Sequence, residues 1–364
     1  MRHNGPIRVL LIDDSQVLRE RLSEALHAGK SIVVVGAARD AVEGRELVIR
    51  HRPDVIVLDL ELPGVDALEF LGKLRESYPV PVLMCSDSRQ RNGPRAIQAI
   101  EIGALDVLLK PGIRSRSAVG AFSEELAEKI RVAHTEARPV AKAPVQPDGA
   151  APSFRETGLD PGNYLVVVGA STGGTEALRA MLSKTPVDFP ATAIVQHMPA
   201  DFTGSFADRL DGYSPMHVSE AGENQILEAG HAVIARGDTH LIVRRRGATW
   251  RTLYTDRRPV NRHCPSVDVL FDSAIKAAGP LAIGILLTGM GCDGGHGLLR
   301  LRQAGALTLA QDRESCVVYG MPKVAANLGA VQYTGRPEEL PELVLRALRS
   351  RREKTPHAST APAT

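Results

Sequence analysis

Short aliphatic runs alternate with amphipathic stretches through the first third of the chain. The stretches over 16–28 and 67–76 carry apolar residues at helical spacing. The runs between such stretches have the length of a strand and are apolar throughout, which is typical of a parallel sheet covered by helices on both faces. The pattern predicts parallel strands at Ile7–Ile12, Ile32–Ala37, Val55–Leu58, Val80–Met84 and Val107–Leu109.

The same alternation returns in the second half of the chain. Parallel strands are expected there at Tyr164–Val168, Ala193–Gln196, His231–Ile234 and Leu281–Thr288. Between the last two, Leu241–Arg244 and Trp250–Thr255 flank a turn-forming Arg-Arg-Gly-Ala segment, which indicates a β-hairpin. The second half is therefore predicted to be a doubly wound, Rossmann-like α/β domain with an inserted β-hairpin.

A proline-rich segment separates these two patterns. Between residues 134 and 160, prolines recur among alanines and charged residues and no apolar periodicity is left, so an extended linker is expected. The last residues, 353–364, are small and polar and are expected to be disordered. Folded domains are thus predicted over 1–133 and 161–352.

The composition fits a two-domain protein of the cytoplasm. The length of 364 residues suffices for about two domains, and 44 Lys and Arg against 42 Asp and Glu leave a net charge of +2. So balanced a charge argues against a protein that coats nucleic acid or an anionic membrane. The apolar runs are too short to span a bilayer, the first residues lack a signal-peptide apolar region, and the four cysteines form no CxxC pair. We expect a cytoplasmic protein that binds no nucleic acid and does not insert into a membrane.

Polar side chains follow four of the first five expected strands. Asp13 and Asp14 follow the first strand, Asp59 the third, Ser86 the fourth and Lys110 the fifth. Because parallel strands end at one edge of the sheet, these groups should gather there. Three carboxylates that close repel one another unless a cation lies among them, and an all-oxygen ligand set favours Mg²⁺. A carboxylate can also accept a phosphoryl group, whose oxygens a hydroxyl and an ammonium would bind. Alternatively, the aspartates cap the next helix and the lysine faces solvent.

These residues lie in motifs that resemble a two-component receiver domain. The motifs are LIDDS at 11–15, LDLELPG at 58–64 and LysPro at 110–111. The resemblance implies a flavodoxin-like fold with Asp59 as the residue that a sensor histidine kinase phosphorylates, and with Ser86 and Lys110 as the groups that sense the phosphate. It also implies Mg²⁺ binding by the carboxylates of Asp13, Asp14 and Asp59. Many receivers carry an aromatic residue where this chain has Val107, so we expect any signal to travel through helix and loop shifts.

The segment GASTGG at 169–174 follows the first strand of the second half and admits three interpretations. A dinucleotide fingerprint would need glycine where Ser171 stands and an acidic residue after the next strand, where this chain has His197. A phosphate loop would need the Walker lysine. A nucleophile turn needs the GxSxG pattern that residues 169–173 provide, with Ser171 at a sharp strand-to-helix turn. The motif alone is weak, because small glycine and serine loops are common helix starts.

Two partners favour the nucleophile turn. His197 and Asp293 each follow an expected strand, so both should lie at the same edge as Ser171. A serine hydroxyl needs a base, and an imidazole needs a carboxylate to fix its tautomer. The chain order Ser–His–Asp differs from that of α/β-hydrolases. Alternatively, His197 is a core histidine and Asp293 caps a helix. Rival bases are His231, His240, His263 and His296, of which the second and third are expected to line the cleft.

Motifs of the second half resemble the chemotaxis protein-glutamate methylesterase (CheB) family. They are GASTGGTEA at 169–177, QHMP at 196–199, PSVDVLF at 265–271 and LTGMGCDG at 287–294. The resemblance implies a nucleophile, a base and an orienting carboxylate at Ser171, His197 and Asp293. Thr172 would line the site, and backbone N–H groups at Gly173–Gly174 and Met290 would stabilise an oxyanion. Cys264 stands where a basic residue is expected, which changes local substrate contacts.

The two resemblances together imply a phosphorylation-regulated serine hydrolase. Its implied reaction removes methyl esters from glutamate γ-carboxylates of methyl-accepting chemoreceptors and releases methanol, with deamidation of receptor glutamines as a second activity. A sensor histidine kinase is the implied phosphodonor, and the ester chemistry needs no cofactor. Two other classes remain. A DNA-binding response regulator would need a basic recognition helix, which the second half does not show. A nucleotide-binding domain would cradle a phosphate in the loop at 169–174.

Overall fold

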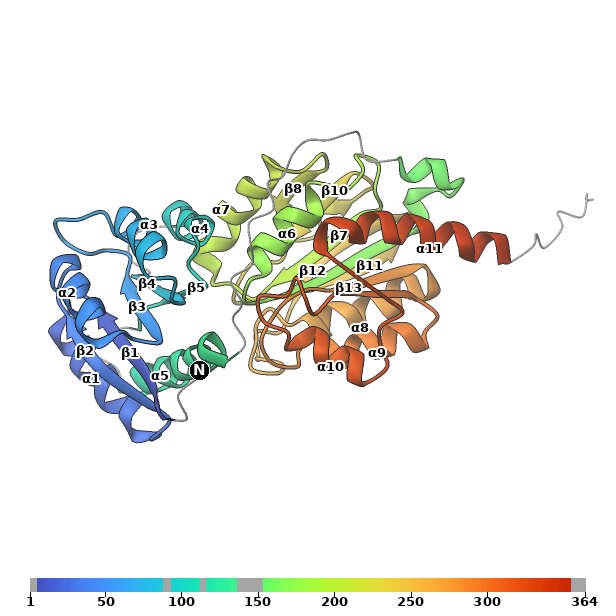
Figure 1. Cartoon of the computed structure of the whole chain (residues 1–364). Helices are drawn as coiled ribbons and strands as arrows, with labels where there is room; N and C mark the ends of the chain where they lie inside the picture. The colour runs from blue at the N-terminus through green and yellow to red at the C-terminus, as the bar shows by residue number, and fades with distance from the viewer. Residues whose placement is uncertain (1–4, 88–92, 112–115, 136–152, 355–364) are drawn as a thin grey trace, which may run out of the picture. The chain divides into compact units, whose positions relative to one another are not determined.

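The computed structural model describes residues 5–87, 93–111, 116–135 and 153–354 (Figure 1). These residues form two compact units, each built on its own parallel sheet. Across these ranges, no helix combines the length and the apolarity that crossing a membrane requires. The α/β class predicted from the sequence is confirmed for both units.

The first unit holds a five-stranded parallel sheet in the order β2-β1-β3-β4-β5. Its strands are β1 (Ile7–Ile12), β2 (Ile32–Ala38), β3 (Val55–Asp59), β4 (Val82–Ser86) and β5 (Asp106–Leu109). Its helices are α1 (Gln16–Ala28), α2 (Ala41–His51), α3 (Ala67–Ser77), α4 (Gly93–Ile102) and α5 (Arg116–Thr135). Every expected strand of this unit is present, although β3 ends one residue and β4 two residues beyond the end that the pattern predicts. Asp59 and Ser86 are therefore the last residues of strands and do not follow them.

Side chains of each strand alternate between two apolar layers. In β1, Leu10 and Ile12 join the cluster that α2, α3 and α4 cover, whereas Val9 and Leu11 join the cluster that α1 and α5 cover. Both faces of the sheet are thus buried, which explains why the strands read as unbroken aliphatic runs.

The second unit holds a seven-stranded parallel sheet in the order β15-β14-β13-β6-β7-β10-β8, and a three-stranded antiparallel sheet in the order β11-β12-β9. The strands are β6 (Leu165–Ala170), β7 (Ala191–Gln196), β8 (His217–Glu220), β9 (Ile226–Leu227), β10 (His231–Ile234), β11 (His240–Arg246), β12 (Thr249–Thr255), β13 (Ala282–Leu286), β14 (Leu307–Gln311) and β15 (Tyr333–Gly335). The helices of this half of the chain are α6 (Gly174–Leu182), α7 (Ala200–Asp211), α8 (Val267–Ala278), α9 (Gly295–Gln303), α10 (Met321–Asn327) and α11 (Leu340–Lys354), with 3₁₀ turns η1 (Phe154–Thr157), η2 (Pro161–Asn163), η3 (Gly279–Leu281) and η4 (Pro337–Glu339). Of these, α7 is divided, because Met198–Phe206 belong to the first compact unit.

The inserted hairpin takes part in the core of the second unit. Strands β11 and β12 pair antiparallel from His240 to Arg246, as the turn-forming segment predicts. Trp250 of β12 packs in one apolar cluster with Leu165 and Val167 of β6 and with Phe271 of α8. The hairpin therefore covers part of the sheet together with α8.

The end of the segment expected to be a linker is folded. Residues 153–160 include the turn η1, and the ring of Phe154 is fully buried at 5.8 Å from the ring of Tyr164 and 6.0 Å from that of Phe189. The carboxylate of Asp188 accepts hydrogen bonds from the Ser153 hydroxyl (2.5 Å) and the Phe154 N–H (2.8 Å). These contacts attach the turn to the second unit, which a proline-rich composition does not reveal. Residues 136–152 of the expected linker and 355–364 of the expected tail lie outside the described residues.

Replacing Phe154 by alanine is expected to lower the free energy of unfolding of the second unit by about 3–5 kcal/mol, because the change empties a buried aromatic site. The fluorescence of Trp250, the protein's single tryptophan, reports this unfolding in urea, because Trp250 lies in that unit's core. Val187→Ala is the matched control: Val187 is 66% exposed, so its loss should change the free energy by at most about 0.5 kcal/mol. Equal unfolding curves for the two variants would contradict the placement of this turn in the folded unit.

Candidate functional site

Three neighbouring strands of the second sheet deliver Ser171, His197 and Asp293 to one edge. Ser171 directly follows β6 and His197 directly follows β7, and the His197 N–H donates to the carbonyl of Ala170 at 3.1 Å. Asp293 follows β13, the other neighbour of β6. The chain runs from β6 to one side of the sheet and later returns to the other side, so this edge is the topological switch point where α/β sheets place their sites.

The backbone of Ser171 is held on both sides. Its N–H donates to the Thr288 carbonyl at 3.0 Å, and its carbonyl accepts from the Gln196 side-chain amide at 3.0 Å. Gly289 passes close by, since a β-carbon there would lie 2.7 Å from the Ser171 β-carbon. The glycine after Thr288 is thus required for the loop of Asp293 to approach the serine.

Helix α6 begins immediately beyond the serine. Gly173 caps it with a φ of +77°, and a β-carbon there would lie 2.5 Å from the β-carbon of Val317, so this position requires glycine on two grounds. The N–H of Gly174 donates to the Ser171 carbonyl at 2.6 Å. Gly174 is therefore not available as the oxyanion donor that the sequence analysis included, while the positive end of α6 still lies beside the serine.

His197 and Asp293 form a buried pair. The His197 Nε2 lies 2.9 Å from the Asp293 Oδ2, and both side chains are almost fully shielded from solvent. The other ring nitrogen, Nδ1, is buried and has no hydrogen-bond partner among the residues that the structure describes. Helix α9 is capped by Gly294, so Asp293 is not its cap, and the alternative interpretation of this aspartate is excluded. The carboxylate fixes the tautomer that leaves a lone pair on Nδ1.

Asp293 accepts hydrogen bonds from an unusually complete set of donors. Besides His197 they are the side chains of Asn261 and Ser266 (both 2.8 Å) and the N–H groups of Val267 (2.7 Å) and Asp268 (3.2 Å). Burial alone would raise the pKa of Asp293, but the hydrogen bond and charge of His197, followed by the bonds from Asn261 and Val267, hold it well below its usual range. The carboxylate is therefore ionised at neutral pH.

Glycines make room for the start of α8 beside this carboxylate. A β-carbon on Gly169 would lie 2.2 Å from a Val267 methyl group, and one on Gly294 would lie 2.5 Å from the same methyl group. Val267 therefore fits between the end of β6 and the start of α9, and its N–H donates to Asp293. The end of β6, the start of α8 and the loop that carries Asp293 are therefore in direct contact.

Three of these groups were missed by the sequence analysis as site residues: Asn261, Ser266 and Asp268. Asp268 accepts from the Asn261 amide at 2.7 Å and from the Gly297 N–H at 2.5 Å. Its burial and the neighbouring charge of Asp293 raise its pKa. The signal for two of them was the PSVDVLF motif, which carried the resemblance without an assigned role.

One of the four rival histidines, His263, contacts His197, and the other three have different surroundings. His240 is fully occupied, because its Nδ1 accepts from the Ser266 N–H at 3.1 Å and its Nε2 donates to the Arg258 carbonyl at 2.8 Å. His231 lies on β10 against Ser219, and His296 is exposed on α9. His263 lies at the site: its ring stacks on that of His197 with centroids 3.7 Å apart and planes inclined by 11°.

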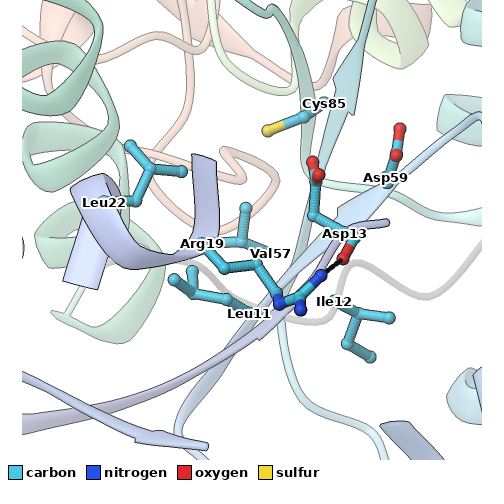
Figure 2. A pocket seen from close by; sticks show the side chains of 8 residues that line it. All are labelled: Leu11, Ile12, Asp13, Arg19, Leu22, Val57, Asp59 and Cys85. Atoms are coloured by element: carbon cyan, nitrogen blue, oxygen red, sulfur yellow. Dashed lines mark hydrogen bonds between the residues drawn. The ribbon is translucent and has the colours of Figure 1, made fainter. Parts of the chain in front are cut away.

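The first unit gathers the expected acidic cluster. Carboxylate oxygens of Asp13, Asp14 and Asp59 lie within 4.8 Å of one another, and Lys110 Nζ lies 2.9 Å from Asp13 and 2.6 Å from Asp59. Figure 2 shows Asp13, which follows β1, and Asp59 at the end of the neighbouring β3, together with Arg19, whose guanidinium donates to the Asp13 carbonyl at 2.6 Å. Asp13, Arg19 and Asp59 line a small cavity of about 10 Å³ together with apolar side chains of the core. Lys110 does not face solvent, and Ser15 rather than an aspartate caps α1.

Burial and charge oppose each other in this cluster. Burial raises the pKa of Asp59 to about 6 although Lys110 lowers it, and burial likewise raises the pKa of Asp13. Burial disfavours the charge of Lys110, yet Asp59 and Asp13 raise its pKa above the usual value. Carboxylates whose ionisation costs free energy, and which offer only oxygen donors, fit a hard divalent cation. The cluster is compatible with Mg²⁺.

Glu61 is a member of this site that the sequence analysis missed. The Ser86 hydroxyl donates to one oxygen of Glu61 at 2.7 Å, and the Asp87 N–H donates to the other at 3.2 Å. Glu61 lies two residues after Asp59 inside the LDLELPG motif. Ser86 therefore has a carboxylate partner in this structure.

Comparison with known proteins identifies both halves. A model of the CheB methylesterase family matches residues 166–344, and a model of the response regulator receiver domain matches residues 9–117. The protein-glutamate methylesterase/protein-glutamine glutaminase of Paraburkholderia xenovorans is 45% identical over 353 residues, which cover 94% of this chain and 97% of that relative. The relative of the same name from Photorhabdus laumondii is 46% identical over 327 residues, which cover 89% and 92%.

Solved structures match each half separately. The catalytic domain of the CheB methylesterase of Thermotoga maritima has a TM-score of 0.49 and 34% identity, and covers 50% of this chain and 98% of that one. The response regulator domain of the same organism's CheB has a TM-score of 0.33 and 35% identity, and covers 35% and 96%. The similarity to the Paraburkholderia relative extends over nearly the whole chain, and this chain therefore belongs to the CheB family of protein-glutamate methylesterases/protein-glutamine glutaminases.

Proposed function

We propose that this protein is a phosphorylation-regulated hydrolase that removes methyl esters from glutamate γ-carboxylates of chemoreceptors and releases methanol. The relatives reported above are named protein-glutamate methylesterase/protein-glutamine glutaminase, which supports the ester hydrolysis. The observation that supports it best is the buried His197–Asp293 pair, whose second ring nitrogen has no hydrogen-bond partner in the described part of the chain. The strand that leads to His197 pairs with the strand that leads to Ser171. We place the receiver domain in residues 1–133 and the catalytic domain in 153–352, since the turn at 153–160 is folded.

The chemistry follows from the three side chains. As the Ser171 Oγ attacks the ester carbonyl carbon, its proton passes to His197 Nδ1, and the ionised Asp293 stabilises the imidazolium through Nε2–H. The carbonyl oxygen becomes an oxyanion, and the backbone N–H groups of Gly173 and Met290 are its proposed donors. Thr172 is proposed to line the same site. One such donor is typically worth ~3–4 kcal/mol in the transition state.

Methanol is released as the acyl-enzyme forms, and the glutamate carboxylate is released when the acyl-enzyme is hydrolysed. When the tetrahedral intermediate collapses, His197 returns the proton to the leaving methoxide and methanol departs. Water then attacks the acyl-enzyme, with His197 again as the base, and frees the glutamate carboxylate. A glutamine side chain can enter the same sequence with ammonia as the leaving group, which gives the glutaminase activity.

The receiver domain is proposed to control this activity through Asp59. A sensor histidine kinase supplies the phosphoryl group, and the Asp59 carboxylate accepts it. Bound Mg²⁺ would be held by Asp13, Asp14 and Asp59 and would neutralise charge on the transferred phosphoryl oxygens. Lys110 is placed to contact these oxygens, and Ser86 can contact them after its hydroxyl leaves Glu61.

The proposed setting is the cytoplasm, where receptor tails and the kinase are present. The rival phosphate-binding interpretation of the loop at 169–174 is weakened, because the Gly174 N–H that would cradle a phosphate donates to Ser171. Methanol release from methylated receptor membranes, measured with the full chain, tests the proposal. Stoichiometric labelling of Ser171 by a fluorophosphonate would accompany it, whereas tight nucleotide binding without labelling would contradict it.

A further inference from the structure

A four-residue turn, Val260–His263, lies against the catalytic side chains. Its ends exchange two backbone hydrogen bonds, from the Val260 N–H to the His263 carbonyl (3.0 Å) and from the His263 N–H to the Val260 carbonyl (2.9 Å). Both central residues are left-handed, with φ of +52° at Asn261 and +69° at Arg262. This is the geometry of a type I′ turn, which usually needs glycine. Keeping two non-glycine residues in this conformation costs free energy, and such strain persists where surrounding contacts enforce it.

The first of these contacts joins the turn to the orienting carboxylate. The Asn261 side-chain amide donates to Asp293 Oδ1 at 2.8 Å and to Asp268 Oδ2 at 2.7 Å. Both amide hydrogens are therefore used, and each goes to a different carboxylate. Without this amide, two buried carboxylates would face each other with one bridging donor fewer, and Asp293 would lose a contact that fixes its Oδ1.

The second contact joins the turn to the base. The His263 ring lies flat on the His197 ring, with centroids 3.7 Å apart and planes 11° from parallel. His197 is already held at one point of its edge by Asp293, through Nε2. The motion that this single bond leaves is rotation about the side-chain bonds, which tilts the ring and changes the direction in which Nδ1 points. A parallel ring in van der Waals contact opposes that tilt.

We propose that Asn261 and His263 are positioning residues of the Ser171, His197 and Asp293 site, held by one strained turn. Asn261 fixes the carboxylate and His263 fixes the plane of the base, while neither exchanges a proton with the substrate. The inference rests on the proposed function, since it assigns roles relative to the serine hydrolase chemistry. It extends the site to a loop in which the sequence analysis saw only rival bases and a family motif.

The test for His263 distinguishes the packing of its flat ring from a direct role of its imidazole in the reaction. His263→Phe keeps a flat ring and is expected to hold kcat within about threefold, whereas His263→Leu removes the plane and is expected to lower kcat about 10- to 100-fold with little change in KM. His217→Leu is the matched control, because His217 stacks on His231 at 4.8 Å in the same unit, away from the catalytic side chains. A phenylalanine variant as slow as the leucine variant would show that the imidazole itself acts, and a fully active leucine variant would show that the stack does nothing. Either result overturns the proposal.

The test for Asn261 separates the amide from the backbone. Asn261→Gly accepts the left-handed conformation but removes the donor, so kcat should fall about 10- to 100-fold. Asn261→Asp also tolerates this conformation but adds a third carboxylate, so its loss should be larger. Arg262→Gly relaxes the same turn and keeps the Asn261 amide that bonds Asp293, so its kcat should fall much less than that of Asn261→Gly. An equal loss in Arg262→Gly and Asn261→Gly would assign the effect to the backbone and overturn the role of the amide.

A spectroscopic readout keeps this inference distinct from the proposed function. In ¹⁵N-labelled protein, the His197 ring nitrogens should show one tautomer with the proton on Nε2, and His263→Leu should broaden or shift these signals while His263→Phe should not. If wild-type protein releases no methanol from receptor membranes and takes up no fluorophosphonate, the proposed function fails, but the ring signals still test the positioning. Unchanged His197 signals in both the His263→Leu and the Asn261→Gly variants would overturn the inference even in a fully active enzyme.

Discussion

Methanol release from methylated receptor membranes is expected to fall by at least about 10⁴-fold when Ser171 is replaced by alanine. The change removes the oxygen that is proposed to form the acyl-enzyme. The position is buried, and the backbone bonds of residue 171 to Thr288 and Gln196 remain. The fold should therefore persist, with Trp250 fluorescence and its urea transition unchanged. The loss would then be chemical and not structural.

A matched variant makes this result specific. Ser183→Ala removes a serine at the C-terminal end of α6, where its hydroxyl donates to the Ala180 carbonyl, and should keep full activity and full fluorophosphonate labelling. Combining Ser171→Ala with His197→Ala should add almost nothing to the first loss, because residues that act as one unit are not additive. Undiminished turnover of Ser171→Ala, or labelling equal to that of the wild type, would leave the hydrolase proposal without its nucleophile.

Replacing Asp59 by asparagine is expected to abolish phosphoryl incorporation from a small phosphodonor in the presence of Mg²⁺. The amide cannot form an acyl phosphate under these conditions, and Lys110 keeps Asp13 as a partner, so the unit should stay folded. The wild-type protein should change its rate of methanol release when the phosphodonor is added, and the variant should not. Phosphoryl transfer is followed by intact-protein mass spectrometry, and the rate by the methanol assay.

The control for this experiment is Asp40→Asn. Asp40 caps α2 from the surface, and asparagine is an equally good cap, so this variant should incorporate phosphate and respond like the wild type. Phosphorylation of Asp59→Asn to the wild-type extent would place the acceptor elsewhere. Equal hydrolysis rates with and without confirmed phosphorylation of the wild type would refute the control of the esterase by the receiver.

The strand ends that carry the two sites were predictable from the sequence because each is a local signal. A buried parallel strand is an aliphatic run, and a polar residue where the run stops marks the edge of its sheet. Ser171 and His197 mark this edge in the second sheet, and Asp59 marks it in the first. Edge strands were harder to predict: β15 spans only Tyr333–Gly335 and β9 only Ile226–Leu227, too short for any period to show. Phe154 was missed because its burial depends on Phe189 and Tyr164, not on its own neighbours in the chain.

The missing site residues share one physical reason. Asn261 and His263 act through a turn whose conformation is left-handed at non-glycine positions, and sequence rules assign such turns to glycine. Their partners, Asp293 and His197, come from other strands, so no spacing rule connects them. Glu61 was likewise hidden, because only the folded unit brings its carboxylate to the Ser86 hydroxyl. The local sequence pattern therefore predicts which strand ends carry the site residues, whereas tertiary contacts determine which other side chains position them.

The order of strands in the second sheet also affects how the protein is made. Strand β6, which leads to Ser171, pairs on one side with β7, synthesised soon afterwards, and on the other side with β13, synthesised much later. Until the ribosome has delivered β13, one edge of an entirely apolar strand has no native partner, and unpaired apolar edges invite association with other chains. A nascent chain stalled before residue 282 thus combines an aggregation-prone edge with a Ser171 that still lacks Asp293, so the protection of this strand edge and the carboxylate of the proposed site both depend on the same later segment of the chain.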